Sequence, residues 1–525
     1  MRSGKGYIPV DSMFPHMGLN TTKPSSQLSP AFSPNCLNCE VADGLLKKRA
    51  GYSLLGGLAN IGATDTVMAV VQFQDAAGNQ HFVAITTKKQ YSYSGNVWTD
   101  VSGGISWSGT ESNSVNWVVI TGTDSGKVLI ITNGLDVPRQ WTGTGNFSNV
   151  TFNYPNFVTC GSFASVGGYL IMADITNSIS GRASQNIAWS AAGKVNEWLD
   201  GNSGAGEQTL YDVRGSIVAL VPLNDQISVY GTNSIHQMIY VAGQLIFSFQ
   251  KIIENTQLLS GHSIVNLGLY HIFMNLDNFQ LYDGSRRLIT SADSIHTSYR
   301  ALIQPNYLSR AFAFLDAAKR RAYFCIPLDA VSVQFYYLEY DLNAINMWKW
   351  TPHILNDRPV SVGLYTPNNS IQWNDASIAG LSWATIIQTW GAGNKTGLPV
   401  PVITGTLGKV FLFDGTAITD NGTNIAGQWD TIDFTVPQEY ESELARWIEL
   451  EFEAFGDSVD IYYSPNEGNN YFLLKSNLIL TSLSTTYRVY LDAVSRTMRF
   501  SFTNVRNNSF QVRWARPWLT PSGAY

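Results

Sequence analysis

The sequence predicts an all-β protein: a β-propeller of about six or seven blades, with an extended N-terminal arm and a C-terminal β-sandwich. Runs of about five to seven residues rich in Val, Ile, Tyr and Phe recur along the chain, closed by turns such as Asp283-Gly284. Groups of three or four such runs repeat every roughly 40 to 50 residues, a spacing typical of propeller blades. No helical pattern of comparable length interrupts them.

Composition favours a multidomain protein or a repeat array, because 525 residues exceed what one hydrophobic core usually supports. Hydrophobic residues make up 44% of the chain, yet no apolar run approaches the ~18 residues of a membrane helix, so we expect no membrane-spanning segment. Only 14% of residues are charged, whereas 25 Tyr, 25 Phe and 15 Trp are present. Such a surface is typical of all-β proteins that stack against copies or partners.

The net charge of -6 argues against a protein that grips nucleic acid by neutralising phosphates. It is compatible with a wall past which DNA slides, because such a wall should not attract phosphate. The basic clusters are short and lie in predicted turns, where we interpret them as solvated tips or contacts between subunits: Lys47-Lys48-Arg49, Lys88-Lys89, Arg286-Arg287 and Lys319-Arg320-Arg321.

Residues 1–60 read as an extended docking arm. Five prolines from Pro9 to Pro34 prevent long regular elements, while Met13, Phe14 and Phe32 require an apolar surface. We therefore expect the arm to dock on its own domain or on a neighbour. Its last part, residues 38–51, suggests a hairpin followed by a basic turn.

Residues 61–425 contain the predicted blades. The clearest unit spans Ile217 to Ile253, with four runs separated by Asn-Asp, Gly-Thr-Asn and Ala-Gly turns. The other units start at Val67, Val115, Phe163, Ser263, Ala311 and Ser361. The last unit is expected to use Ser361 to Tyr365, Trp383 to Gln388 and Val410 to Phe413, interrupted by a Gly/Pro-rich loop from Gly391 to Pro401.

Residues 426–525 contain longer predicted strands in which apolar and polar residues alternate, and this pattern predicts the β-sandwich. The sharpest pattern is Trp447 to Phe455, where Ile448, Leu450, Phe452 and Ala454 should face a core. Glu449, Glu451 and Glu453 then share the opposite face, and Glu439, Glu441 and Glu443 lie just upstream. Two interpretations remain open: a charged face that prevents wrong pairing of sheets, or an acidic wall beside a nucleic-acid path.

Local motifs do not point to a metal, a cofactor or catalysis. Cys36 and Cys39 form a C-x-x-C without a second pair or a suitably spaced His, so two thiols in a turn are expected. The seven histidines are dispersed, and neither H-E-x-x-H nor G-x-S-x-G occurs. Ser464 to Tyr471 is similar to the Asp-box turn of sialidase-like propellers but carries Asn466 for the Asp and Tyr471 for the Trp, so we predict a hairpin turn.

The order of these pieces resembles a known group. The stretch from Asn35 to Tyr52, which contains Gly44-Leu45-Leu46-Lys47-Lys48-Arg49-Ala50-Gly51-Tyr52, resembles the start of tail proteins from short-tailed bacteriophages, with Ala50 where that group tends to have Pro. Further stretches resemble the blades of its tail nozzle, or packaged-DNA-stabilisation, proteins: Ile187 to Ser190 with Trp198, Ile217 to Leu220, Ser234 to Met238 and Phe279 to Gly284.

The resemblance implies a structural protein of the virion tail. Because no apolar segment follows Met1 to Gly6, we expect synthesis in the host cytoplasm without a cleaved signal, and the lack of catalytic motifs predicts no enzymatic activity. The resemblance also implies a hexameric ring that forms the distal DNA channel, retains the packaged genome and conducts it at ejection without sequence-specific binding. Implied partners are an adaptor ring on the portal side and tail fibres or a tip protein. A glycan-binding propeller or adhesin is the alternative, and a propeller hydrolase with an acid pair at the central pocket is a third reading.

Overall fold

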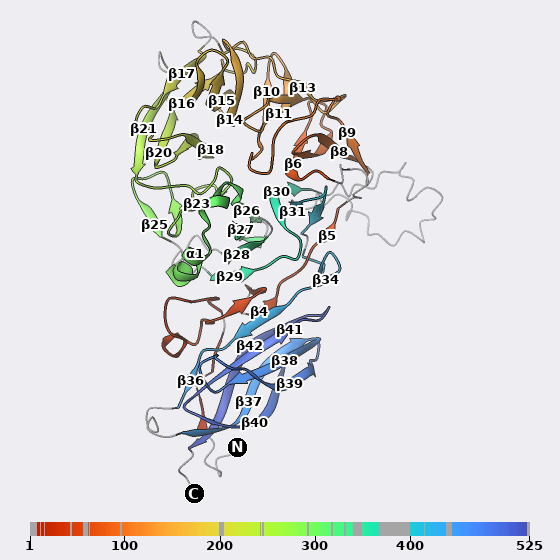
Figure 1. Cartoon of the computed structure of the whole chain (residues 1–525), viewed down its shortest axis with the longest axis vertical. Coiled ribbons are helices and arrows are strands. Elements are labelled where there is room, and N and C mark those ends of the chain that lie inside the picture. Colours follow the sequence, from red (N-terminus) through yellow and green to blue (C-terminus); the bar gives the residue numbers. More distant parts are fainter. Residues whose placement is uncertain are drawn as a thin grey trace, which may run out of the picture.

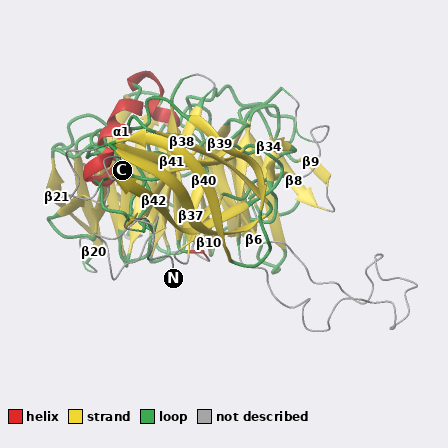
Figure 2. Cartoon of the chain, turned by 90° about the horizontal axis from the view of Figure 1, so that it is seen from below, coloured by secondary structure: helices red, strands yellow, loops and turns green. Residues whose placement is uncertain are grey.

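The structure, a computed structural model, has a ring of small sheets above a two-layered β domain (Figure 1). It describes residues 8–10, 12–14, 16–42, 45–55, 61, 64–94, 97–198, 204–241, 243, 246–290, 293–316, 319–329, 332–339, 349–366, 399–413, 415–436 and 444–521. Seen from below, the long strands of the lower domain lie in front of the ring (Figure 2). Within the described ranges, no helix has the length and apolar character that crossing a membrane requires.

Seven four-stranded antiparallel sheets form the ring in the described part of the chain, and the all-β propeller prediction is confirmed. The first three blades comprise β6 (Val67–Gln74), β7 (Gln80–Thr86), β8 (Gln90–Ser94), β9 (Val97–Asp100), β10 (Asn116–Gly122), β11 (Gly126–Thr132), β12 (Arg139–Trp141), β13 (Ser148–Asn149), β14 (Phe157–Val166), β15 (Tyr169–Asn177), β16 (Gly181–Trp189) and β17 (Gly206–Thr209). The next three comprise β18 (Ile217–Leu223), β19 (Gln226–Gly231), β20 (Ser234–Tyr240), β21 (Phe247–Glu254), β22 (Ile264–Asn266), β23 (His271–Met274), β24 (Phe279–Tyr282), β25 (Leu288–Thr290), β26 (Phe312–Asp316), β27 (Arg321–Pro327), β28 (Val333–Glu339) and β29 (Lys349–His353).

Separate apolar clusters hold neighbouring blades together. Ile130 of the second blade packs in one cluster with Leu170 and Met172 of the third, and all three are fully buried. Tyr230 of the fourth blade and Phe273 of the fifth blade pack together in another cluster. Burying each such side chain contributes about 1.5–3 kcal/mol to stability. Both faces of the central strands in each blade are covered by neighbouring blades, and this is why their sequences are continuous apolar runs.

The seventh blade takes its strands from both ends of the propeller. Its order is β30 (Pro359–Tyr365), β31 (Val400–Gly405), β32 (Val410–Leu412) and β5 (Ser53–Leu54), with Phe411 opposite Leu54. Residues that precede the first blade thus complete the last one and close the ring. The predicted strand Trp383 to Gln388 lies outside the described residues, and the prediction of a loop up to Pro401 is wrong at its end, because Val400 and Pro401 begin β31.

Short helical segments lie between the fifth and sixth blades, where the sequence predicts none. They are η3 (Asp293–Ile295), α1 (His296–Leu302) and η4 (Pro305–Arg310). Tyr299 on α1 is fully buried and donates a hydrogen bond to the Asn275 carbonyl at 2.5 Å. This contact fixes the connection against the fifth blade.

The lower domain is a sandwich of two six-stranded sheets. One follows the order β3 (Cys39–Ala42), β4 (Leu45–Lys48), β42 (Phe510–Pro521), β37 (Ala445–Gly456) and β40 (Thr485–Ser495), with β1 (Ile8–Pro9) also on β42. The other follows β2 (Cys36–Leu37), β35 (Gly427–Asp430), β41 (Thr497–Asn504), β38 (Ser458–Ser464) and β39 (Phe472–Ile479), with β36 (Phe434–Thr435) on β41. A small pair, β33 (Thr419–Asp420) and β34 (Thr423–Asn424), connects the two domains.

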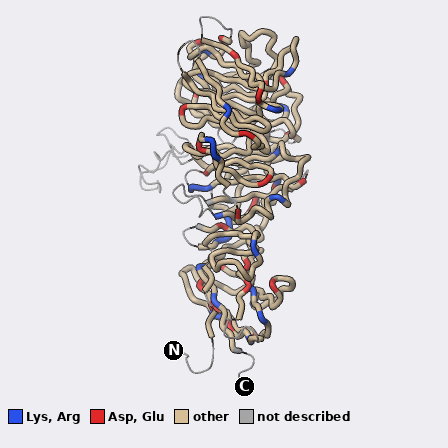
Figure 3. The backbone as a smooth tube through the Cα atoms, turned by 90° about the vertical axis from the view of Figure 1, so that its left-hand side faces the viewer, with Lys and Arg blue, Asp and Glu red and all other residues tan. Residues whose placement is uncertain are grey.

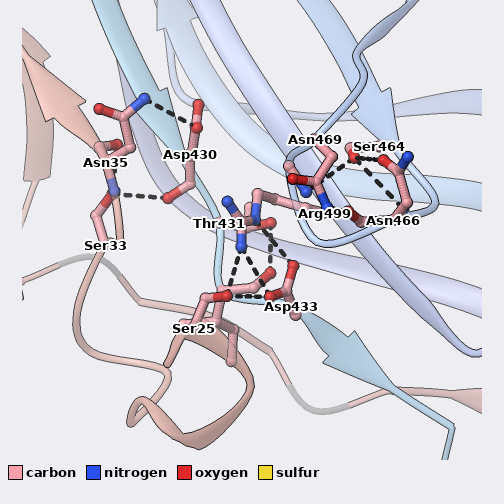
Figure 4. A network of polar contacts seen from close by, with 12 residues as sticks. Ser25, Ser33, Asn35, Asp430, Thr431, Asp433, Ser464, Asn466, Asn469 and Arg499 are labelled. Atoms are coloured by element: carbon pink, nitrogen blue, oxygen red, sulfur yellow. Dashed lines mark hydrogen bonds and ion pairs between the residues drawn. The ribbon is translucent and has the colours of Figure 1, made fainter. Parts of the chain in front are cut away.

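The N-terminal segment packs on its own chain, where it supplies strands to both sheets of the sandwich and to the seventh blade. Figure 4 shows how its non-strand part is attached, near η1 (Ser25–Gln27). The Ser33 hydroxyl donates to the Asp430 carbonyl at 2.7 Å, and the Asn35 amide donates to the Asp430 carboxylate at 3.1 Å. Asp433 accepts from Ser25 and forms an ion pair of 2.7 Å with Arg499. Residues 8–54 therefore belong structurally to both domains.

The cysteines and the Asp-box-like stretch have structural positions. All four cysteines are free and buried, and Cys36 and Cys39 pack in the sandwich core. A hydrogen bond with the Cys39 thiol and burial raise the pKa of Cys36, which disfavours a reactive thiolate. Among the described residues, no cluster of His, Cys, Asp or Glu could hold a metal ion. Ser464 to Tyr471 forms the hairpin turn between β38 and β39, as predicted, with the Gly468 amide donating to the Ser464 hydroxyl at 2.9 Å.

Two buried histidines should make the fold acid-sensitive. Burial lowers the pKa of His271 to about 4 and that of His353 to about 3. Because unfolded histidine titrates near about 6.5, the unfolded state binds more protons than the folded state below that pH, so stability is lost as pH falls. We expect the free energy of unfolding to drop by about 3 kcal/mol through His271 alone between about pH 6.5 and 4.

Thermal unfolding measured in steps from neutral pH to the acid range would test this. The variant His271→Gln should flatten the dependence on pH, whereas His16→Gln, which changes a histidine that is only partly buried, should leave it unchanged. Equal slopes in the wild type and both variants would contradict the prediction.

Candidate functional site on the outer face of the sandwich

The predicted glutamate row lies on β37, on the face opposite the sandwich core. Leu450, Phe452 and Ala454 are fully buried on the core side, as expected. Ile448 does not join them, because the register of β37 shifts between Trp447 and Glu449 and Trp447 takes the core position. Glu439, Glu441 and Glu443 lie outside the described residues.

Ion pairs within the chain neutralise much of the row. Arg488 on β40 contacts the Glu451 carboxylate at 2.6 Å and that of Glu449 at 3.4 Å. These two glutamates are only 7% and 6% exposed, and the Trp518 indole also donates to Glu451 at 3.2 Å. Glu449 and Glu451 are therefore paired carboxylates under a partly exposed arginine.

Glu453 is the most solvent-accessible of the three and also has partners. Arg513 pairs with it at 2.8 Å, and the Trp514 indole donates to it at 2.7 Å. A hydrogen bond from Ser484 is the main cause that lowers the pKa of Glu453, with the Trp514 and Arg513 contacts adding to it. Glu453 therefore stays ionised and accepts hydrogen bonds.

Several partners of the row come from β42, and the sequence pattern contained them. Trp514, Arg516 and Trp518 alternate on β42 and stand in register with Glu453, Glu451 and Glu449. The Arg516 guanidinium lies over the Trp514 ring at 5.6 Å. A tryptophan or arginine at every second position indicates that these side chains share one face of the strand. Only the pairing of β42 with β37 shows that this face is the one that carries the glutamates.

An uncovered apolar edge borders this face. β39 and β40 are the outermost strands of their two sheets, on the same side of the sandwich. Large apolar side chains along them and in their connection are half or more exposed: Phe472 50%, Leu473 54%, Ile479 66%, Leu483 76%, Tyr490 67% and Val494 53%. Two open strand edges next to exposed apolar side chains are a surface that needs a partner.

The propeller has a second polar site, near the innermost strands. Glu111, which precedes β10, contacts Arg310 and Arg358 at 2.6 Å each and accepts from Thr66 at 2.7 Å. The three partners precede the innermost strands of the sixth, seventh and first blades. Glu111 thus ties blades from opposite ends of the propeller sequence together.

This propeller site has little space for a ligand. The cavity beside Glu111 measures about 40 Å³, and Asp329 and His262 also line it. Burial raises the pKa of Glu111, but hydrogen bonds from Arg358 and Thr66 and the two arginine charges outweigh it and hold the pKa below its usual value. Such a carboxylate is a poor general acid, because it is ionised at neutral pH.

Comparison with known proteins identifies no family for this chain. No family model matches the chain, and no curated protein does either. Among solved structures, an exo-beta-1,3-galactanase from Phanerochaete chrysosporium is 14% identical, with 86% of this chain and 100% of that chain covered and a TM-score of 0.27. BBS1N in complex with ARL6DN is 8% identical, with 70% and 99% covered and a TM-score of 0.40. A putative gluconolactonase is 12% identical, with 58% and 94% covered and a TM-score of 0.30.

Several of these neighbours are enzymes. Their identities and TM-scores are too low to transfer an activity, a substrate or a partner to this chain.

Proposed function

We propose that this chain is a structural subunit of a ring in the tail of a short-tailed bacteriophage. In this proposal six copies surround the distal DNA channel, retain the packaged genome and conduct it at ejection. The ring would join an adaptor ring on its portal side and carry fibres or a tip protein. The resemblance of residues 35–290 to tail nozzle proteins motivates the proposal, and the uncovered edge of the sandwich carries it.

The edge formed by β39 and β40 supports association with further copies. β40 has eleven residues, of which only Leu491 and Ser495 are buried. The two strands also present unpaired backbone groups on one side, since each is the last strand of its sheet. A neighbouring subunit that covers this edge would remove the apolar side chains from water, which contributes about 25 cal/mol per Å² of apolar area.

In such a ring, DNA would pass between subunits and not through the propeller. The described cavity near the innermost strands holds about 40 Å³ and is bordered by the ion pairs of Glu111. Ligand pockets for small molecules are several times larger, about 300–1,000 Å³. The channel of the assembly would therefore be bounded by outer faces of several copies.

The charges of the chain suit a wall that duplex DNA touches without binding. Acidic and basic residues are interspersed over both domains in Figure 3, and the net charge is -6. The glutamate row offers no large attraction to phosphate, and its paired arginines limit repulsion. A conduit requires this weak net interaction, because counterion release at many free lysines and arginines would hold the DNA back.

The assembly can be tested by changing the edge. We expect the wild type to form a closed ring in electron cryomicroscopy, and the double variant Leu473→Glu with Ile479→Glu to remain a monomer in light scattering after size-exclusion chromatography. Both side chains are exposed, so the variant should keep the melting temperature of the wild-type monomer. Ile179→Glu places one such charge on a more exposed propeller position, 79% accessible, and should leave assembly intact.

Two results would contradict the proposal. One is a wild type that stays monomeric at all concentrations and is held singly at the periphery of virions. The other is an assembly that the edge variant does not disturb.

A glycan-binding adhesin is the second candidate, favoured by the aromatic side chains on the sandwich face. Tyr490 on β40 is 67% exposed and lies opposite Glu449 on β37. Trp518 on β42 lies opposite Glu449 from the other side. Aromatic rings beside carboxylates and arginines can bind sugars by stacking and hydrogen bonds. Binding to a glycan array that is lost in Tyr490→Ala, in particles where the chain lies peripherally, would favour this function over the ring.

A further inference from the structure

A basic cavity lies at the junction between the propeller and the sandwich. It measures about 310 Å³, much more than the cavity beside Glu111. Five cationic side chains and one carboxylate line it: Lys47, Lys48, Arg49, Lys319, Arg321 and Glu40. They come from β3, from β4 and the residue after it, and from the start of β27 and the turn before it, so both domains contribute.

Three of the five cations have carboxylate partners within the chain. Arg49 pairs with Asp420 at 2.6 Å, with both side chains fully buried. Arg321 pairs with Glu40 at 3.0 Å. Lys319 contacts Asp316 at 3.6 Å.

Lys48 is buried without a carboxylate among its described partners. Its ammonium donates to the Asn504 side chain at 3.1 Å and to the Arg506 and Asn508 carbonyls at 2.7 and 3.0 Å, all neutral acceptors. The residue is only 7% exposed, and burial lowers its pKa to about 8. Removing an ammonium from water without a counter-charge costs several kcal/mol, as an order of magnitude. The junction thus contains a buried positive charge that an anion could compensate.

Lys47 adds a second unmatched charge at the same cavity. It is half-buried on β4, and no hydrogen bond or ion pair of its ammonium occurs within the described residues. Together, Lys47 and Lys48 leave the cavity with an excess of two positive charges over its carboxylate partners.

We propose that this cavity binds a phosphate-type oxyanion that carries at least two negative charges. The Lys47 ammonium can donate charge-assisted hydrogen bonds to such an anion, which are among the strongest in proteins. Lys48 contributes its charge, because its three N–H groups already have acceptors. A volume of about 310 Å³ reaches the lower range of small-ligand sites and exceeds the needs of a single phosphate ion. The phosphates belong either to a small free molecule or to a nucleic-acid backbone at the domain junction. The site is independent of the proposed ring, because all its described residues come from one chain.

Calorimetric titration of the full chain with inorganic pyrophosphate would test the site. We expect saturable binding at one site per chain and, in Lys47→Met, an affinity that is weaker by about tenfold or more. Lys47 is half-buried, so this variant should fold, whereas replacing the buried Lys48 risks unfolding. Lys127→Met is the matched control, because Lys127 is also a half-buried strand lysine but lies on β11 in the second blade. Its affinity should equal that of the wild type.

Fluorescence anisotropy with a short labelled DNA duplex, at matched ionic strength, distinguishes the two sources of phosphate. Binding of pyrophosphate but not of duplex identifies a small molecule as the ligand. Binding of duplex that Lys47→Met weakens and Lys127→Met does not identifies a DNA backbone. Failure of both probes, or equal binding by Lys47→Met and the wild type, would overturn the proposal.

Discussion

Replacing Arg49 with alanine should lower the free energy of unfolding by about 3–5 kcal/mol, because it leaves a buried carboxylate without its counter-charge. The Arg49 guanidinium contacts both Asp420 oxygens, at 2.8 and 2.6 Å, and donates to the Asn38 side chain at 3.0 Å. It also donates to the Ile354 carbonyl at 2.7 Å. One side chain thus joins the N-terminal segment, the end of the sixth blade and the connection between domains. Urea unfolding followed by tryptophan fluorescence measures the loss.

A double-mutant cycle separates this charge effect from lost packing. The pair Arg49→Met with Asp420→Leu removes both charges, so we expect it to recover much of the stability that either single change loses. The exposed pair Lys89 and Asp100, 42% and 40% accessible, provides the control, since Lys89→Met should cost less than about 1 kcal/mol. A loss in Arg49→Ala no larger than in the control would contradict the assignment of Arg49 as the link between domains.

The Gly51→Ala variant should be destabilised by about 3 kcal/mol or more, because the backbone leaves no space for a methyl group. A Cβ atom at Gly51 would lie 1.9 Å from the Thr419 carbonyl oxygen. This close approach lets the Gly51 amide donate to the Ala417 carbonyl at 2.7 Å and the Tyr52 amide to the Thr419 carbonyl at 3.1 Å. These bonds hold the residues just before β5, the strand that completes the seventh blade, against the segment that contains β33. Thermal unfolding and limited proteolysis would measure the loss.

Gly145→Ala serves as the graded control for Gly51→Ala. Gly145 has a φ of +64° and nothing within 4 Å of an added Cβ, so only the left-handed conformation is penalised, by about 1–2 kcal/mol. Equal effects of the two substitutions would show that the approach of Gly51 to Thr419 does not limit the fold.

The sequence by itself determined the all-β class, the blade repeat and most of the inner strands. Runs such as Val128 to Thr132 and Ile217 to Leu223 are apolar, β-branched and bounded by turns, and these local properties define a buried strand. The outward position of Glu449, Glu451 and Glu453 also follows from a period of two. Each of these features depends on neighbours in the chain, which is why sequence reasoning reaches it.

Pairing between distant segments was decided only in the tertiary structure. Ser53 and Leu54 form a strand of two residues, too short for any periodicity, and they complete the seventh blade by pairing with Leu412 and Phe411. The bulge at Ile448 likewise arises where β37 meets two partner strands at once.

The candidate sites depend on such long-range pairing even more. Arg488 and Trp518 reach Glu451 because β40 and β42 flank β37, and the cavity beside Lys47 and Lys48 exists because two domains meet there. Charge neutralisation and cavity formation require side chains from several segments at one place. The sequence pattern identifies some of those side chains, but it does not show which of them lie close together in the fold.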